Sequence, residues 1–311
     1  MGRTSGQSAA ARQALLALLL TAVLAAAAGA AWLLQEIAQR RVDKGAAILK
    51  QIRSNKLALY WPDRRQTDWY LIQQGSVVLG WHAIVREGSG GGFRGWEIEL
   101  GYNQAGATER EMHSAWNLNA DATDGTYQSR VERRGQPTEL TQIRLQESAS
   151  EADQATVEVL QPTLALEAQS PEPRNYIPEG VLPLAIRLVA EGGADAQFRM
   201  VFDDIPNSHK VVEFGSVRIS HEGRGRTDQG EQTHRVRVYY RGWGKHPREY
   251  ELDESGKLIS IVSGNVRWVA ASAADVAKRF PNAPETVRRF AQPRPATQEE
   301  TPRRRGLFSF F

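Results

Sequence analysis

The feature that most constrains this chain is an uninterrupted apolar run, "ALLALLLTAVLAAAAGAAWLL", at residues 14–34. The run contains no charged side chain, and it is rich in leucine and alanine. As an α-helix it would extend about 32 Å, which matches a hydrocarbon core of about 30 Å. Leucine favours insertion, and Trp32 lies at the far end, where an interfacial aromatic ring belongs. The run therefore predicts one transmembrane helix, with Trp32 as a membrane-contact residue.

A cleaved signal peptide is the competing interpretation of the same run. Its apolar core would be residues 14–24, followed by an Ala-x-Ala-like site in "AAAAGAA". Two features favour retention. The apolar run continues to Leu34, and the segment "QEIAQRRVDKGAAILKQI" predicts a membrane-proximal helix over residues 35–56 that continues out of the membrane. We expect the segment to be retained, and cleavage stays the alternative.

Two features of the sequence predict opposite orientations for the span. A short head, residues 1–13, carries Arg3 and Arg12 directly before the uncharged run, as in a signal-anchor. This favours a cytoplasmic head, a single pass through the inner membrane, and a body in the periplasm or outside the cell. Basic residues beyond the span favour the opposite orientation by the positive-inside rule; these are Arg40, Arg41, Lys44, Lys50 and Arg53. We expect export of the body.

The body, residues 57–290, has the alternating pattern of β-strands. Strand-like segments recur in two runs, about 67–168 and 196–270, and polar turns separate them. An apolar helix is predicted between the runs at 180–191, and Ser272 is predicted to cap a last helix with Asp275 as its capping-box acid. We predict a mainly β fold with a few helices: a strongly curved antiparallel sheet, or half-barrel, with a plug helix. Two separate sheets are the alternative, and residues 291–311 are predicted to be a disordered tail.

Three segments resemble bacterial envelope half-barrel proteins with a layout like that of lipoprotein carriers. They are "YLIQQGSVVLGW", "PEGVLPLAIRLVA" and "REYELDESGKLISI". The resemblance is one of layout and covers about a quarter of the body. It implies a bent antiparallel sheet plugged by helices, whose concave face holds a lipid or an acyl chain.

Several kinds of chemistry are excluded or disfavoured by the residues present. The chain has no cysteine, so disulfides and thiolate sites are impossible, and its six histidines show no close metal-ligand spacing. The segment "GGGFRG" matches a dinucleotide-loop pattern, but a predicted strand follows it instead of a helix. The body is nearly neutral because the basic excess lies at the two ends of the chain. We expect no metal, no cofactor, no nucleic-acid binding and no enzymatic activity.

Aromatic residues supply the candidate binding positions. All but one of the eight tryptophans lie in the body. Packing in the core is their ordinary role, and an aromatic-lined groove is the functional alternative. The candidates for the concave face are Trp81, Trp96, Trp116 and Trp268. The segment "YYRGWGKHPREY" mixes aromatic and basic residues, which suits either an anionic headgroup surface or an amphipathic edge hairpin.

The C-terminal segment "PRRRGLFSFF" combines basic and aromatic residues. This composition suits an anionic membrane surface or a docking peptide, and a solubilising tail is the alternative. The membrane-contact candidates here are Arg303, Arg304, Arg305, Phe308, Phe310 and Phe311.

These observations lead to two main functional hypotheses, and a hydrolase with a distributed active site is a third alternative. The first is a membrane-anchored envelope protein that binds a lipidic or other apolar ligand in the concave face of its half-barrel. The second is a non-enzymatic scaffold or interaction subunit of an envelope complex, which would have a filled core and use its surface to contact protein partners.

Overall fold

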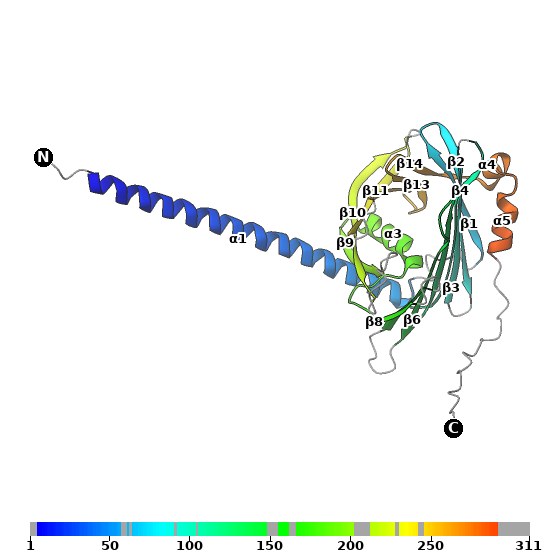
Figure 1. The fold of residues 1–311 in the computed structure, drawn as a ribbon, viewed down its shortest axis with the longest axis horizontal. Coiled ribbons are helices and arrows are strands. Elements are labelled where there is room, and N and C mark those ends of the chain that lie inside the picture. Colours follow the sequence, from blue (N-terminus) through cyan, green and yellow to red (C-terminus); the bar gives the residue numbers. More distant parts are fainter. Residues whose placement is uncertain are drawn as a thin grey trace, which may run out of the picture.

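The computed structural model describes residues 5–56, 61, 64–89, 92–103, 105–147, 155–161, 166–201, 212–227, 230–241 and 246–291. A single long helix, α1 (Ser5–Gln51), projects from a β-barrel-like body (Figure 1). It is followed directly by η1, a π-helical turn at Ile52–Lys56. The apolar run and the membrane-proximal segment thus form one continuous helix. Within the described residues, α1 alone is long and apolar enough to cross a membrane, and its apolar stretch packs against no other part of the protein.

The strands alternate in their burial, as the sequence pattern predicts. They are β1 (Gln66–Gln74), β2 (Val77–Ser89), β3 (Gly92–Tyr102), β4 (Thr108–Asn119), β5 (Gly125–Arg133), β6 (Glu139–Glu147), β7 (Ala155–Gln161), β8 (Leu166–Pro171), β9 (Ala196–Val201), β10 (Phe214–Arg226), β11 (Gln232–Arg241), β12 (Arg248–Asp253), β13 (Leu258–Ser263) and β14 (Val266–Ala271). Gly75 has a φ of +59° in the tight turn between the first two, a conformation that favours glycine.

All 14 of these strands belong to one antiparallel sheet, in the order β8-β7-β6-β5-β4-β3-β2-β1-β14-β13-β12-β11-β10-β9. The two predicted strand runs join where β1 pairs with β14, for example Tyr70 with Ala270. The prediction of a single curved sheet is therefore confirmed, and the two-sheet alternative is wrong. Within each run, every strand pairs with the strand next to it in the sequence, so the pairing of β1 with β14 is the one pairing between strands far apart in the sequence.

The two ends of the sheet curl round until they meet. One apolar cluster contains side chains of β6–β8, such as Leu145 and Val157, together with Val201 of β9 and Phe214 of β10. The edge strands β8 and β9 are not hydrogen-bonded to each other. Instead, Tyr176 forms a parallel bridge with Arg199 of β9, so a short segment fills the seam. The sheet is open in its hydrogen bonding but nearly closed in shape (Figure 1).

The interior of the curved sheet is filled by a plug. It consists of η2 (Glu179–Val181) and α3 (Leu182–Gly192), and α3 lies inside the barrel in Figure 1. The helix is apolar on nearly all sides, as expected for a helix surrounded by core, and Gly193 ends it in a left-handed conformation at φ +62°. The same core receives Ile48, Leu49 and Ile52 from the end of α1. The plug predicted at 180–191 is confirmed.

Two short helices cover part of the outer face of the sheet. They are α4 (Ala273–Arg279) and α5 (Ala283–Phe290), which lie outside the barrel on the side of β1 (Figure 1). Ser272 caps α4 in a capping box with Asp275, as predicted. The second helix was not predicted from the sequence, because Pro281 ends α4 and the residues after it lack a long apolar stripe. Val276 and Val287 anchor the two helices in a second apolar cluster.

Candidate functional site

Charged side chains from several strands meet inside the barrel. Glu97 and Glu99 alternate along β3 with residues that face outward, so both carboxylates point inward. Glu99 accepts hydrogen bonds from Arg110 Nη1 at 2.7 Å and from Trp268 Nε1 at 3.1 Å. His82 Nε2 lies 2.9 Å from Glu97 Oε1. These contacts join β2, β3, β4 and β14 into one polar cluster against an otherwise apolar core.

Glu97 is held in its charged form by this cluster. Burial by itself raises the pKa of Glu97, but the hydrogen bond and charge of His82 and the charges of Arg248 and Arg110 outweigh it. The net effect holds the pKa of Glu97 below its ordinary value. About 29% of its side chain is still accessible to solvent, whereas Glu99 is buried. Glu97 therefore remains partly accessible to solvent although its carboxylate points inward.

The lowered pKa of Glu97 gives a pH prediction. A carboxyl whose pKa is lower in the folded than in the unfolded state stabilises the fold above its unfolded value of about 4.3, and this contribution is lost as the pH falls through the folded pKa. We expect Glu97→Gln to remove that part of the acid dependence. The measurement is the urea midpoint between pH 7 and pH 3. Glu109→Gln, at an exposed position on β4, is the control and should retain the wild-type profile. Equal acid dependence in wild type and Glu97→Gln would contradict this assignment.

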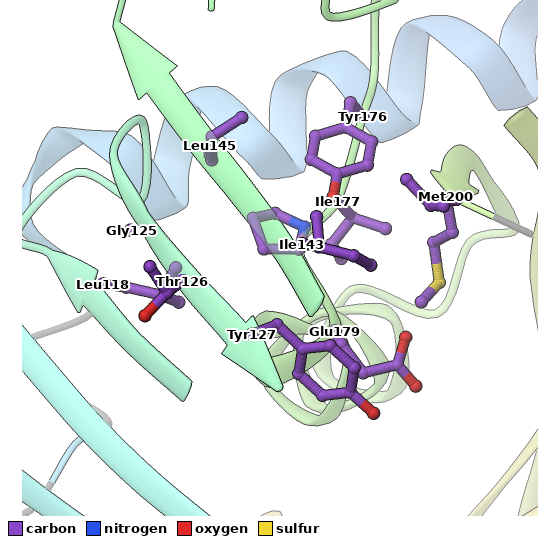
Figure 2. A pocket seen from close by; sticks show the side chains of 12 residues that line it. Leu118, Gly125, Thr126, Tyr127, Ile143, Leu145, Tyr176, Ile177, Glu179 and Met200 are labelled. Atoms are coloured by element: carbon purple, nitrogen blue, oxygen red, sulfur yellow. The ribbon is translucent and has the colours of Figure 1, made fainter. Parts of the chain in front are cut away.

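A small cavity lies beside the plug, where two walls of the barrel approach each other. Tyr127, Ile143, Tyr176, Glu179 and Met200 converge on it (Figure 2). Its volume is about 20 Å³, which is enough for one water molecule but not for an acyl chain. Burial, followed by the charge of Glu179, raises the pKa of Tyr127 well above its ordinary value, so its hydroxyl stays protonated. This part of the interior is a filled core.

A much larger hollow lies on the outer face of the sheet. It is a groove of about 890 Å³ across β3–β6, and Phe290 at the end of α5 forms part of its wall. Its outward-facing lining combines apolar, charged and amide side chains: Arg94, Trp96, Ile98, Glu111, His113, Ala115, Asn117, Gln128, Arg130, Glu132, Leu140, Gln142 and Phe290. The ring of Phe290 packs on His113 with 4.0 Å between the ring centroids, which fixes the wall of the groove.

The floor of the groove is apolar and its sides are charged with both signs. Trp96 is nearly buried between Arg65, whose guanidinium lies 5.3 Å from the ring centroid, and the second apolar cluster. Arg130 forms an ion pair with Glu132 on the same strand. A mixture of aromatic floor and balanced polar rim is the composition of protein–protein contact surfaces, and it lacks the basic excess that nucleic acids require.

The predicted concave-face tryptophans do not share one face. Trp116 lies in the interior core, and Trp268 packs against that core. Trp81 and Trp96 belong to the outer cluster under α4 and α5, so their assignment to the concave face is wrong. The physical reason is strand register. Gly95, not Trp96, pairs with Trp116, and neighbours directly across a ladder point to the same side.

The structure tests none of the predicted membrane contacts. Trp32 is 67% exposed on α1, and its contact with a membrane stays a prediction. Arg303, Arg304, Arg305, Phe308, Phe310 and Phe311 lie outside the described residues. Their role at a membrane stays a prediction.

Sequence reasoning missed both the groove and the interior polar cluster. The signal for the cluster was the alternation in "WEIELGY", where carboxylates interrupt a strand whose other face is strongly apolar. Such acids ordinarily face water, so the pattern alone does not place them inside. In the described part of the chain, no group of three or more acidic or histidine side chains is arranged to hold a metal ion.

Fold and sites together define a β-barrel-like protein with a plugged interior, an outer groove and one long N-terminal helix. No family model matches the chain, and no curated protein matches it. Among solved structures, the chain is similar to a beta-barrel-like protein of the domain of unknown function DUF1849 from Brucella abortus. The two chains are 13% identical, the match covers 67% of this chain and 95% of that one, and the TM-score is 0.44.

Proposed function

We propose that this protein is a non-enzymatic interaction subunit of a bacterial cell envelope, anchored in the inner membrane by α1. Its outer groove would bind an extended segment of a partner polypeptide, and its body would lie in the periplasm or outside the cell. The observation that carries the proposal is the contrast between the two hollows. The groove holds about 890 Å³, whereas the cavity beside the plug holds about 20 Å³.

A polypeptide fits the groove better than a lipid does. The outward face of β3 and β4 presents a small apolar patch, in which Trp96 and Ile98 follow each other along β3 and Trp96 pairs with Ala115 of β4. Polar side chains such as Asn117 and Gln128 lie beside this patch. An extended peptide can place apolar side chains on the patch and hydrogen-bonding groups at its border. An acyl chain would leave the ion pair of Arg130 and Glu132 in contact with hydrocarbon, which is unfavourable for charged groups.

The proposal predicts protein crosslinks at the groove alone. A photoreactive residue in place of Asn117, an exposed position in the groove, should form adducts with another polypeptide in cells that contain the full chain. Gln128→Trp should abolish these adducts, because Gln128 is exposed in the same groove and a large ring would fill it. The same photoreactive residue at Gln232, an exposed position on β11, is the matched control and should give no such adducts.

The outcomes separate the competing functions. Peptide adducts at position 117 that disappear with Gln128→Trp support the proposal. Adducts with lipid, or adducts that are equal at positions 117 and 232, would overturn it.

An apolar ligand inside the barrel is the second candidate. The observation in its favour is that Tyr127, Tyr240 and Trp268 pack against the interior core and are only partly buried. Gentle purification of the full chain followed by mass spectrometry tests this candidate. If this candidate is correct, a lipid co-purifies in a stoichiometric amount with the wild type and with Gln128→Trp. The lipid should be lost when Trp268 is replaced by a charged residue.

A further inference from the structure

One side of the barrel carries an arginine-rich surface that the proposed function does not use. On β10 and β11 the inward positions belong to Val217, Ile219, Val236 and Val238, which are fully buried in the core. The alternate positions therefore face outward, and they include Arg218, Arg235, Arg237 and Arg241. We name these four residues the arginine face.

The charge of the arginine face is only partly compensated. Arg237 pairs with Glu249 of β12 at 2.5 Å, and the guanidinium of Arg218 stacks over the ring of Tyr239 at 4.1 Å. Arg235 and Arg241 are both exposed. Arginines outnumber carboxylates on the two strands, so the surface is positively charged although the body as a whole is nearly neutral.

Contacts with α1 fix where this surface lies. Arg41 of α1 pairs with Asp195 at 3.3 Å. The other oxygen of Asp195 accepts hydrogen bonds from Ser220 Oγ at 3.0 Å and from the backbone N–H of His221 at 3.2 Å. Ser220 is paired with Arg237 across the ladder. A chain of short contacts thus links α1 at position 41 directly to the strands that carry the arginine face.

The distance from the predicted span is short. The apolar run ends at Leu34, and the seven helical residues from there to Arg41 rise by about 10 Å. The contact of Arg41 with the body therefore lies about one Debye length, 8–10 Å at 0.1–0.15 M salt, beyond the end of the apolar run. The strands of the arginine face reach this contact at Ser220. In Figure 1, α1 leaves the body on the side of β9–β11, while α4 and α5 lie on the opposite side.

We propose that the arginine face binds the anionic phospholipid headgroups of the bilayer that α1 spans. The proposal rests on the anchoring role of α1 in the proposed function. Arginine forms forked hydrogen bonds with phosphate oxygens, and basic residues close to an anionic leaflet are attracted to it. Binding at this face would hold the body against the membrane and leave the groove beside α5 pointing away from it.

The test uses the full chain in nanodiscs, and the absence of cysteine makes site-specific labelling direct. One fluorophore is attached at Ser216→Cys on the outer side of β10, and in a second sample at Ala274→Cys on α4. Energy transfer to an acceptor lipid is compared between pure phosphatidylcholine and mixtures with phosphatidylglycerol. We expect transfer from position 216 to rise with the anionic lipid and to fall back in 1 M salt, where the Debye length is about 3 Å. Energy transfer from position 274 should not change with anionic lipid or with salt.

Charge variants identify the residues responsible. Arg235→Glu combined with Arg241→Glu should abolish the response to phosphatidylglycerol, and the two lysine substitutions at the same positions should preserve it. Lys278→Glu combined with Arg279→Glu makes the same change of charge on the far side and should leave the response intact.

Two failures are distinguishable. If the protein enters nanodiscs but energy transfer from position 216 does not depend on anionic lipid, the proposal that the arginine face binds headgroups is wrong. The proposal that α1 anchors the protein is then unaffected. A protein that does not co-migrate with nanodiscs overturns the anchor and, with it, this inference.

Discussion

Replacing Gly45 by valine is expected to separate the end of α1 from the body. A Cβ at position 45 would lie 2.2 Å from the backbone oxygen of Gln197 in β9, and a backbone oxygen in a ladder cannot move aside. On either side of this contact, Val42 O accepts a hydrogen bond from Asn175 Nδ2 at 2.7 Å, and Ile48 is buried in the core. The substitution therefore acts at the closest point of approach between helix and sheet.

The expected magnitude depends on how the helix responds. Overpacking with a local shift costs about 1–3 kcal/mol. Complete undocking would expose Ile48, Leu49 and Ile52, at about 1.5–3 kcal/mol for each side chain. Urea unfolding measures the loss of stability, and trypsin cleavage at Arg41 or Lys44 reports whether the helix has come away.

Gly29→Val provides the matched control for this prediction. It lies in the same helix, and a Cβ there would meet nothing within 4 Å. The helix-propensity change is the same at both positions, so any difference comes from docking on β9. Equal stability and equal trypsin resistance in both variants would show that α1 does not pack on the body as described.

Trp116→Ala is expected to cause the largest loss of stability in the interior. The indole of Trp116 lies between two glycines that come from different layers. A Cβ at Gly95 of β3 would lie 2.2 Å from the ring, and a Cβ at Gly180 of the plug would lie 2.4 Å from it. Removing a buried tryptophan costs about 3–5 kcal/mol, because the cavity cannot collapse when both walls are fixed backbone.

A double-mutant cycle tests the contact between the Trp116 ring and Gly180 of the plug. Gly180→Ala should destabilise the wild type by about 1–3 kcal/mol through overpacking and should be much less costly in the Trp116→Ala background, where the ring is absent. Trp32→Ala, the same substitution at a site outside the body, should leave its unfolding unchanged. Additive effects of Gly180→Ala and Trp116→Ala would mean that the plug does not rest on this ring.

The strands and the plug were predictable because their signals are local. Alternation from residue 66 to residue 271 predicts nearly every strand, the capping box of Ser272 predicts the start of α4, and the apolar segment that ends at Gly192 predicts α3. Each depends on neighbours within a few residues of one another.

The faces of the tryptophans were not predictable, because the sheet is covered on both sides. Trp81 and Trp96 point toward α4 and α5, and Trp116 points toward the plug. Alternation separates the two faces of a strand but does not say which one is concave when both are apolar. The answer depends on curvature, which arises from the meeting of β6–β8 with β9–β10, far apart in the sequence.

The groove was not predictable for a related reason. Its floor comes from four strands, but its wall depends on α5, and Ala291 just beyond that helix is buried and accepts a hydrogen bond from Arg65. This contact joins residues 226 positions apart. Nothing in the local pattern of either segment reveals it.

The way α1 and residues 175–177 cover β9 has a consequence for fragments cut from the protein. A protease that cuts between the apolar run and Arg41 would release a fragment in which α1 still covers part of the edge strand β9, because the contacts at Val42, Gly45 and Ile48 remain. A cut beyond Ile52 would remove α1 and expose the edge of β9 near Gln197, while Tyr176 would still bridge Arg199. Other chains could then pair with the exposed part of the edge. The end of α1 would thus decide whether such a fragment stays monomeric or associates with other copies.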